Sequence, residues 1–155
     1  MKRSLLLFGV IALLFCSALT AFAQIPNASF ENWTAGSPDN WFVNNVSALG
    51  WTPVTRTSTA HSGTYALRGD VITMPTGGVL SPQIITGTSA AGFAVNQRYG
   101  AITGYYQFSP SSGDRFFVTA AMYKGGASGV GVAAAGGYLT TAASSYTQFS
   151  FMAVI

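Results

Sequence analysis

Charged residues are scarce in this chain, at 7% of its residues, and cysteine occurs only once, at position 16. A protein that binds nucleic acid needs clustered Lys and Arg. The sequence excludes nucleic acid as a partner because the cations beyond Lys2 and Arg3 are single and scattered (Arg56, Arg68, Arg98, Arg115 and Lys124). The part of the chain after position 16 has no cysteine, but it is long enough to bury a core without disulfides.

Acidic residues and histidine are equally few. The acids are Glu31, Asp39, Asp70 and Asp114, and the only histidine is His61. A glycoside hydrolase normally needs two carboxylates at a set separation, and a zinc or catalytic histidine needs partners. We therefore predict no catalytic residue and expect His61 to be a loop residue.

Helical periodicity is also missing after residue 24. Short stretches that alternate apolar and polar residues recur instead, separated by Gly, Pro, Ser and Asn. This pattern predicts an all-β fold, an antiparallel β-sandwich or a barrel, in a single domain over residues 24–155. The expected strands are Ala28–Glu31, Trp41–Val46, Thr52–Thr57, Thr64–Thr73, Gly78–Ile85, Ala101–Phe108, Arg115–Lys124, Gly129–Ala135 and Thr147–Val154.

The clearest alternation lies in Ala101–Phe108. Ile102, Gly104, Tyr106 and Phe108 share one face of this strand, and the residues between them share the other. Arg115–Lys124 repeats the pattern, and the loop 109–114 between the two predicts that they pair as a hairpin. The Gly- and Ala-rich segment that follows, 125–137, is either a linker or a strand with small side chains, and its alternation favours the strand.

The first 23 residues differ from the rest. Lys2 and Arg3 precede an apolar run from Leu5 to Leu19, and Ala21-Phe22-Ala23 forms a small-residue cleavage site. These are the parts of a secretory signal peptide. The sequence therefore predicts export, with a secreted or cell-surface location and no membrane span after cleavage.

Five motifs in a fixed order resemble those of a known family. They are Asn-x-Ser-Phe-Glu-x-Trp at 27–33, Pro-x-x-Trp at 38–41, Ser-Gly-Thr-Tyr-Ala-Leu-Arg at 62–68, Arg-Tyr-x-x-Ile-Thr-Gly-Tyr-Tyr-Gln-Phe at 98–108 and Gly-Asp at 113–114. Together they resemble the carbohydrate-metabolism domain family of secreted bacterial proteins, which is similar to galactose-binding-like jelly rolls and carbohydrate-binding modules. The resemblance covers nearly all of residues 25–151 and implies a jelly roll.

The resemblance also implies a structural calcium ion. In similar modules the Glu of the first motif binds calcium together with backbone carbonyls, so Glu31 and the neighbourhood of Gly63 are the expected ligands here. An Asp from the last strand completes the site in those modules and has no counterpart in this chain. Phe149, Phe151, Ala153 and Ile155 alternate as a buried strand does. The resemblance implies one more strand after them, so we expect a jelly roll that lacks its last strand and has an unpaired apolar edge.

Aromatic residues supply the expected ligand contacts. Trp33 and Trp41 lie beside turn signals, which favours a place in the core, whereas Trp51 lies in a loop. Aromatic rings stack on the C–H groups of sugars while polar side chains bind the hydroxyls. The predicted ligand-binding residues are Trp51, Tyr105, Gln107, Arg115 and Tyr123. Surface tyrosines without a ligand are the alternative.

Three functions are compatible with these observations. The first is a non-catalytic module that binds a polysaccharide or a cell-surface glycan. The second is a glycan-active enzyme, either a glycoside hydrolase or a lyase. The third is a structural adhesin or spacer domain without a small ligand, in which Trp51, Tyr105 and Tyr123 would be dispersed.

Overall fold

The computed structural model describes residues 25–89, 92–111 and 113–154. The expected signal peptide and Ile155 lie outside these residues. Twelve strands and one short 3-10 helix, η1 (Ser47–Leu49), make up the described elements. The strands are β1 (Trp33–Thr34), β2 (Ser37–Pro38), β3 (Trp41–Val43), β4 (Val54–Thr57), β5 (Ala66–Gly69), β6 (Ile72–Thr73), β7 (Val79–Leu80), β8 (Ile84–Thr86), β9 (Ala101–Phe108), β10 (Phe116–Lys124), β11 (Val130–Leu139) and β12 (Ala143–Met152).

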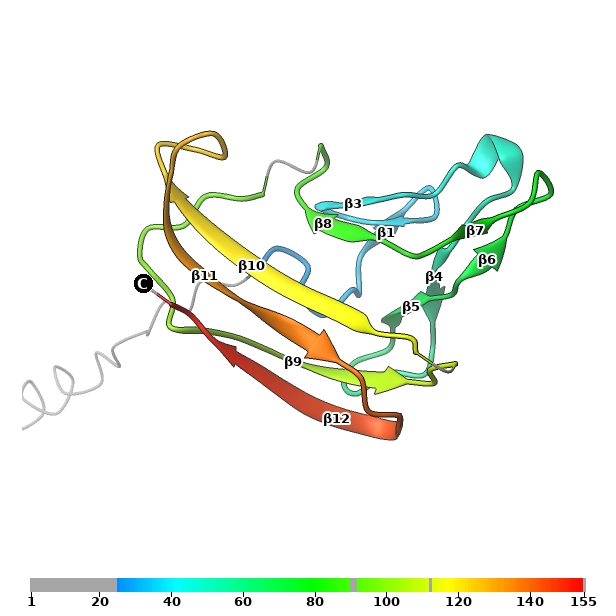
Figure 1. The fold of residues 1–155 in the computed structure, drawn as a ribbon. Helices are drawn as coiled ribbons and strands as arrows, with labels where there is room; N and C mark the ends of the chain where they lie inside the picture. Colours follow the sequence, from blue (N-terminus) through cyan, green and yellow to red (C-terminus); the bar gives the residue numbers. More distant parts are fainter. Residues whose placement is uncertain (1–24, 90–91, 112, 155) are drawn as a thin grey trace, which may run out of the picture.

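The strands form antiparallel pairs, which confirms the all-β class. The pairs are β1–β2, β3–β8, β4–β5, β6–β7, β9–β12 and β10–β11. Figure 1 shows the four long strands β9 to β12 gathered on one side of the molecule and the short pairs on the other. The jelly-roll arrangement expected from the family resemblance stays a prediction.

Strand β9 occupies the predicted range, Ala101–Phe108, because its alternation is unbroken. Ile102, Gly104, Tyr106 and Phe108 are half-buried, and the residues between them are exposed. Gly104 lies opposite Phe149 of β12, and a Cβ added at Gly104 would meet the Phe149 ring at 2.7 Å. The glycine therefore makes room for an aromatic ring across the strand pair, an arrangement that helps to fix register.

The predicted pairing of β9 with β10 is wrong. β10 pairs with β11, and β9 pairs with β12 from the far end of the segment. The turn from β10 to β11 contains Gly125 and Gly126, which both have positive φ and so suit a tight reversal. The 109–114 loop instead carries the chain from one strand pair to the other. The segment after Gly126 does form a strand, as expected, and β11 extends to Leu139.

The predicted strand Ala28–Glu31 is also wrong, because these residues form turns. Asn27 and Phe30 have positive φ, and the Phe30 N–H donates to the Asn27 carbonyl at 3.0 Å. The Asn27 side chain donates to the carbonyls of Asn32 and Asp39 and accepts the Asn32 N–H. Side-chain hydrogen bonds of this kind compete with strand pairing, and asparagine tolerates positive φ.

Several other N-terminal strands are shorter than expected. The segment Trp41–Val46 contributes β3 and then leads into η1, and Thr64–Thr73 is divided into β5 and β6. Gly78–Ile85 is likewise divided into β7 and β8. Asn side chains hold the break after β3 and the break between β7 and β8. Asn45 bonds both backbone groups of Val54, and Asn44 bonds the backbones of Ser81 and Gln83.

Fully buried side chains are few among the described residues. The buried apolar residues are Val54, Ala133, Ala135 and Ala143, joined by Pro38 and Pro53. Trp33 and Trp41 are half-buried, and each indole N–H donates to a backbone carbonyl. The two tryptophans thus hold the turns around residues 26–41 through their indole N–H groups, but neither is fully buried as a place in the core requires.

The two long strand pairs meet at the end of β12. The Ala153 N–H donates to the Gly100 carbonyl at 2.8 Å, which extends the β9–β12 pair. Val154 forms an antiparallel bridge to Ala134 of β11, which joins this pair to the β10–β11 pair. A Cβ added at Gly137 of β11 would meet the Phe151 ring of β12 at 2.5 Å. Nowhere in the described part of the chain is there a helix long and apolar enough to cross a membrane.

Candidate functional site

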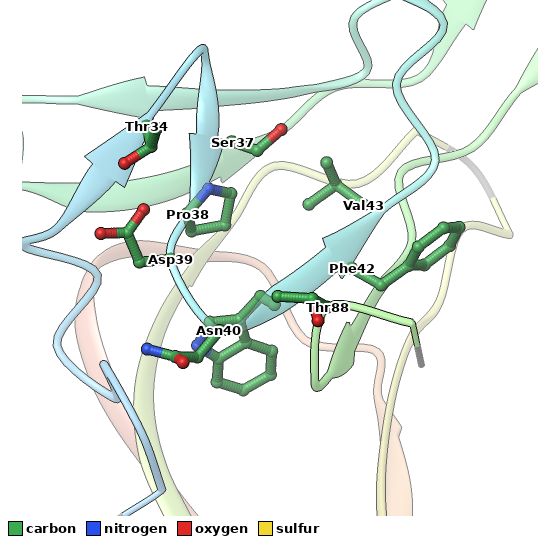
Figure 2. Close-up of a pocket in the computed structure, with 9 residues that line it drawn as sticks. Thr34, Ser37, Pro38, Asp39, Asn40, Phe42, Val43 and Thr88 are labelled. Atoms are coloured by element: carbon green, nitrogen blue, oxygen red, sulfur yellow. The ribbon is translucent and has the colours of Figure 1, made fainter. Parts of the chain in front are cut away.

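A pocket of about 580 Å³ opens beside the turn that precedes β3. Figure 2 shows Thr34 and Asp39 toward one end of it and Phe42 toward the other. The remaining lining residues are Ser37, Pro38, Asn40, Trp41, Val43 and Thr88. The pocket is shallow and open, and hydroxyl, amide and carboxylate groups from neighbouring turns meet there.

The aromatic ring of Trp41 is committed to the framework rather than displayed to a ligand. Its ring centroid lies 5.1 Å from that of Phe30, and its N–H donates to the carbonyls of Pro26 and Asn27. These contacts fix the orientation of the indole at the wall of the pocket.

Glu31 holds the loop that connects β4 to β5. Its Oε1 accepts the N–H groups of Thr64 at 2.9 Å and Tyr65 at 3.1 Å. Gly63 has φ +75°, and an added Cβ would collide with the same Oε1. The motif around Glu31 therefore places a carboxylate where only glycine leaves room, and two N–H groups compensate its charge.

The donors around Glu31 bear on the expected calcium ion. Oε1 already accepts two N–H groups, so a cation would have to bind through Oε2 and through oxygen atoms of other groups. The part of the chain that the structure describes contains no cluster of three or more His, Cys, Asp or Glu side chains. Calcium at Glu31 and Gly63 stays a prediction, and the contacts observed at Glu31 are its hydrogen bonds with the N–H groups of Thr64 and Tyr65.

The other acids also have identifiable surroundings. Asp70 forms an exposed salt bridge with Arg68 at 2.8 Å, and its hydrogen bond and charge raise the pKa of Arg68. Asp114 accepts the Ser111 N–H within its own loop. Asp39 is the acid that lines the pocket.

His61 lies on the loop that Glu31 holds, and it stacks on Tyr105 of β9. The ring centroids are 3.6 Å apart and the planes differ by 11°. Tyr146 of β12 meets His61 edge-on at 5.6 Å, and the Tyr146 hydroxyl donates to the Thr59 carbonyl at 2.7 Å. The loop is thus fixed at both ends, and His61, Tyr105 and Tyr146 form an aromatic cluster, which we call the Tyr105 platform.

The surroundings of the Tyr105 platform are polar and uncharged. Gln107 follows on the same face of β9, and its Nε2 donates to the Ser144 carbonyl at 3.1 Å. Gln148 lies directly across from Tyr105, and Ser150 lies across from Thr103. Tyr105 itself is 48% exposed, so part of its ring is free to contact a ligand.

The five predicted ligand-binding residues are divided among four places. Tyr105 and Gln107 lie together on β9. Arg115 precedes β10 and Tyr123 lies near the other end of that strand, so eight residue steps, or roughly 26 Å, separate them. Trp51 lies after η1 and pairs with Val46.

The sequence did not predict three residues that form aromatic contacts with the predicted ligand-binding residues. His61 was expected to be an ordinary loop residue, whereas Tyr146 and Tyr138 drew no prediction. Tyr138 lies opposite Phe117 and is contacted by Arg115, with the guanidinium carbon 4.8 Å from the ring centroid. The alternation in β10 and β12 indicated which side chains face outward, but the strand partners that bring these rings together are not apparent from either strand alone.

Comparisons with known proteins add no assignment, since no family model, no curated protein and no solved structure matches the chain.

Proposed function

We propose that this chain is a secreted, non-catalytic module that binds a polysaccharide or a cell-surface glycan through the Tyr105 platform. The observation that carries the proposal is the stack of His61 on Tyr105 at 3.6 Å, with Tyr105 still 48% exposed. A ring that is already held in place loses little conformational entropy when it binds a ligand. This preorganisation favours a binding role for Tyr105 over that of an unconstrained surface residue.

The polar groups beside Tyr105 suit an uncharged sugar. An aromatic ring stacks on the C–H face of a pyranose, and neighbouring amides and hydroxyls bind its hydroxyl groups. Gln107 commits its Nε2 to Ser144, which leaves its amide oxygen as an acceptor. Gln148 and Ser150 extend the same exposed face.

The placement of the acids supports a non-catalytic role. A carboxylate pair for glycoside hydrolysis requires two groups that both face the substrate. Glu31, Asp70 and Asp114 each take part in hydrogen bonds within the protein, and Asp39 lines the pocket without a second acid. The predicted signal peptide and the family resemblance favour a module that acts outside the cell.

The test compares two tyrosines of equal exposure. Tyr105 and Tyr123 are 48% and 49% exposed, but Tyr123 lies on β10, away from His61. Tyr105→Ala should weaken binding to an uncharged polysaccharide about tenfold, because a stacking contact and its buried area are lost. Affinity electrophoresis against a panel of plant, algal and host glycans measures the effect. Equal losses in Tyr123→Ala, or no binding by the wild-type protein to any glycan, would contradict the proposal.

A further inference from the structure

A second exposed aromatic surface lies on the β10–β11 pair. Phe117 and Tyr138 are direct partners across the two strands, with ring centroids 4.9 Å apart and planes tilted by 39°. Their exposed fractions are 54% and 56%. Two large rings held side by side with half of their surface in water provide apolar area that a flat ligand can cover.

Arg115 adds a positive charge to these rings. Its guanidinium carbon lies 4.8 Å from the centroid of the Tyr138 ring, close enough for a cation–π contact. Within the described residues, the one salt bridge is the Arg68–Asp70 pair. The neighbouring Asp114 carboxylate is turned into its own loop, where it accepts the Ser111 N–H at 2.8 Å. The charge of Arg115 is therefore available to an anion.

We propose that Arg115, Phe117 and Tyr138, the Arg115 patch, bind an anionic sugar such as a uronic acid within a glycan chain. The rings contact the C–H face of the sugar. The planar guanidinium of Arg115 donates two parallel hydrogen bonds to the carboxylate, a geometry that an ammonium group cannot reproduce. This specificity goes beyond the Tyr105 platform, whose neighbours in β9 and β12 are uncharged.

The size and charge of the patch favour a sugar over a macromolecular partner. A stable protein interface covers about 800 Å² on each partner, far more than three side chains supply. Binding to nucleic acid needs several clustered cations, whereas Arg115 and Lys124 lie at opposite ends of β10. One cation beside two rings fits a single charged sugar residue.

The test uses polygalacturonate and its fully methyl-esterified form, which share a backbone and differ in charge. Wild-type protein should bind polygalacturonate and lose most of that affinity on esterification. Arg115→Gln should weaken binding to polygalacturonate roughly tenfold, since a charge-assisted hydrogen bond is lost. Phe117→Ala should weaken binding to a similar extent. Circular dichroism checks that each variant is folded.

Two controls separate this proposal from its alternatives. Lys124→Gln removes the same charge at the other end of β10 and should leave affinity within about twofold, because screening weakens the field of a distant surface cation. The ratio of the affinities for polygalacturonate and its esterified form distinguishes the two surfaces. Arg115→Gln should lower this ratio, whereas Tyr105→Ala should leave the ratio unchanged, so failure of the Tyr105 platform and failure of the Arg115 patch are distinguishable.

Three outcomes would overturn the proposal. The first is an equal loss of affinity in Arg115→Gln and Lys124→Gln. The second is equal affinity of the wild-type protein for the charged and the esterified polymer, and the third is an affinity for double-stranded DNA that equals the affinity for polygalacturonate. Dextran sulfate distinguishes the source of the anion. Binding to it that also depends on Arg115 indicates a sulfated sugar, and binding to polygalacturonate alone indicates a carboxylate.

Discussion

At the scale of single residues, Glu31 connects the framework to the proposed binding surface. It caps the N–H groups of Thr64 and Tyr65, and the loop that precedes them carries His61 onto Tyr105. A carboxylate that accepts two backbone N–H groups holds a loop more firmly than a neutral acceptor does. Glu31 is thus a positioning residue for the Tyr105 platform.

Replacing Glu31 tests both this role and the predicted calcium ion. Glu31→Gln should lower the free energy of unfolding by about 1–2 kcal/mol, because the charge-assisted hydrogen bonds become neutral. Asp70→Asn, which removes an acid from the exposed salt bridge with Arg68, should cost less than about 1 kcal/mol. Urea unfolding measures both values.

The same variants decide the calcium question. A structural ion stabilises the folded state that binds it, so wild-type protein should melt later in calcium than in chelator. Glu31→Gln should abolish that difference, whereas Asp70→Asn should retain it. If wild type and Glu31→Gln each melt at the same temperature with and without chelator, Glu31 is a hydrogen-bonded acid and the calcium prediction is wrong.

Gly63 offers a complementary measurement. It has positive φ, and an added Cβ would collide with Glu31, whereas Gly36 has positive φ with open space around it. Gly36→Ala should cost about 1 kcal/mol from backbone strain alone. Gly63→Ala should cost at least about 2 kcal/mol, because the Glu31 carboxylate must also leave its two donors. Equal costs in urea unfolding would show that the contact between Gly63 and Glu31 adds nothing.

At the scale of elements, local pattern predicted the long strands and failed at the turns. The range of β9 was correct because its alternation is unbroken, and β11 was recognised from Gly-Val-Gly-Val-Ala. The predicted strand at Ala28–Glu31 failed because Asn27 bonds Asn32 and Asp39 through its side chain. Apolar alternation carries no information about such competing hydrogen bonds.

The pairing of strands was the second feature that local sequence patterns could not predict. Each of β9 and β10 presents an apolar face that several partners could cover, and the partner of β9 lies after two intervening strands. The same limit applies to the prediction of the candidate site. Tyr105 and Gln107 were predicted from their place in β9, whereas His61 and Tyr146 join them only through the pairing and the loop of the folded chain.

The contact between Gly137 and Phe151 joins β11 to β12, and it can be measured as a coupling. Gly137→Val should cost about 2 kcal/mol, because its side chain would overlap the Phe151 ring. In the background of Phe151→Ala the same substitution should cost at least 1 kcal/mol less, roughly the coupling expected of residues in contact. Additive effects in a double-mutant cycle would show that the two strands do not press together at this point.

At the scale of the whole molecule, the long strands have open edges. Each of β9 to β12 has one hydrogen-bonded partner strand among the described residues, apart from the bridge between Ala134 and Val154. Large apolar side chains lie exposed near these edges, with Met152 at 74%. Exposed apolar strands with unpaired backbone groups favour association between chains.

A charge at the end of β12 should therefore reduce self-association. Met152→Lys should lower light scattering at high protein concentration and leave the melting temperature nearly unchanged, because this side chain is already exposed. Val79→Lys adds the same charge to the short strand β7, where Val79 is 63% exposed, and serves as the control. If both variants reduce scattering equally, net charge rather than the β12 edge governs association.

The separation of β9 from β12 along the chain has a consequence for the order of folding. The β10–β11 hairpin closes through a short turn, so its loop-closure entropy is small and it should form early. Once the hairpin has formed, fewer flexible residues separate Phe108 from Ala143 along the chain. These two residues are the partners in the β9–β12 pair that lie nearest to the hairpin in sequence. The hairpin is then a template on which β9 and β12 meet late, and the Tyr105 platform becomes one of the last features of the molecule to assemble.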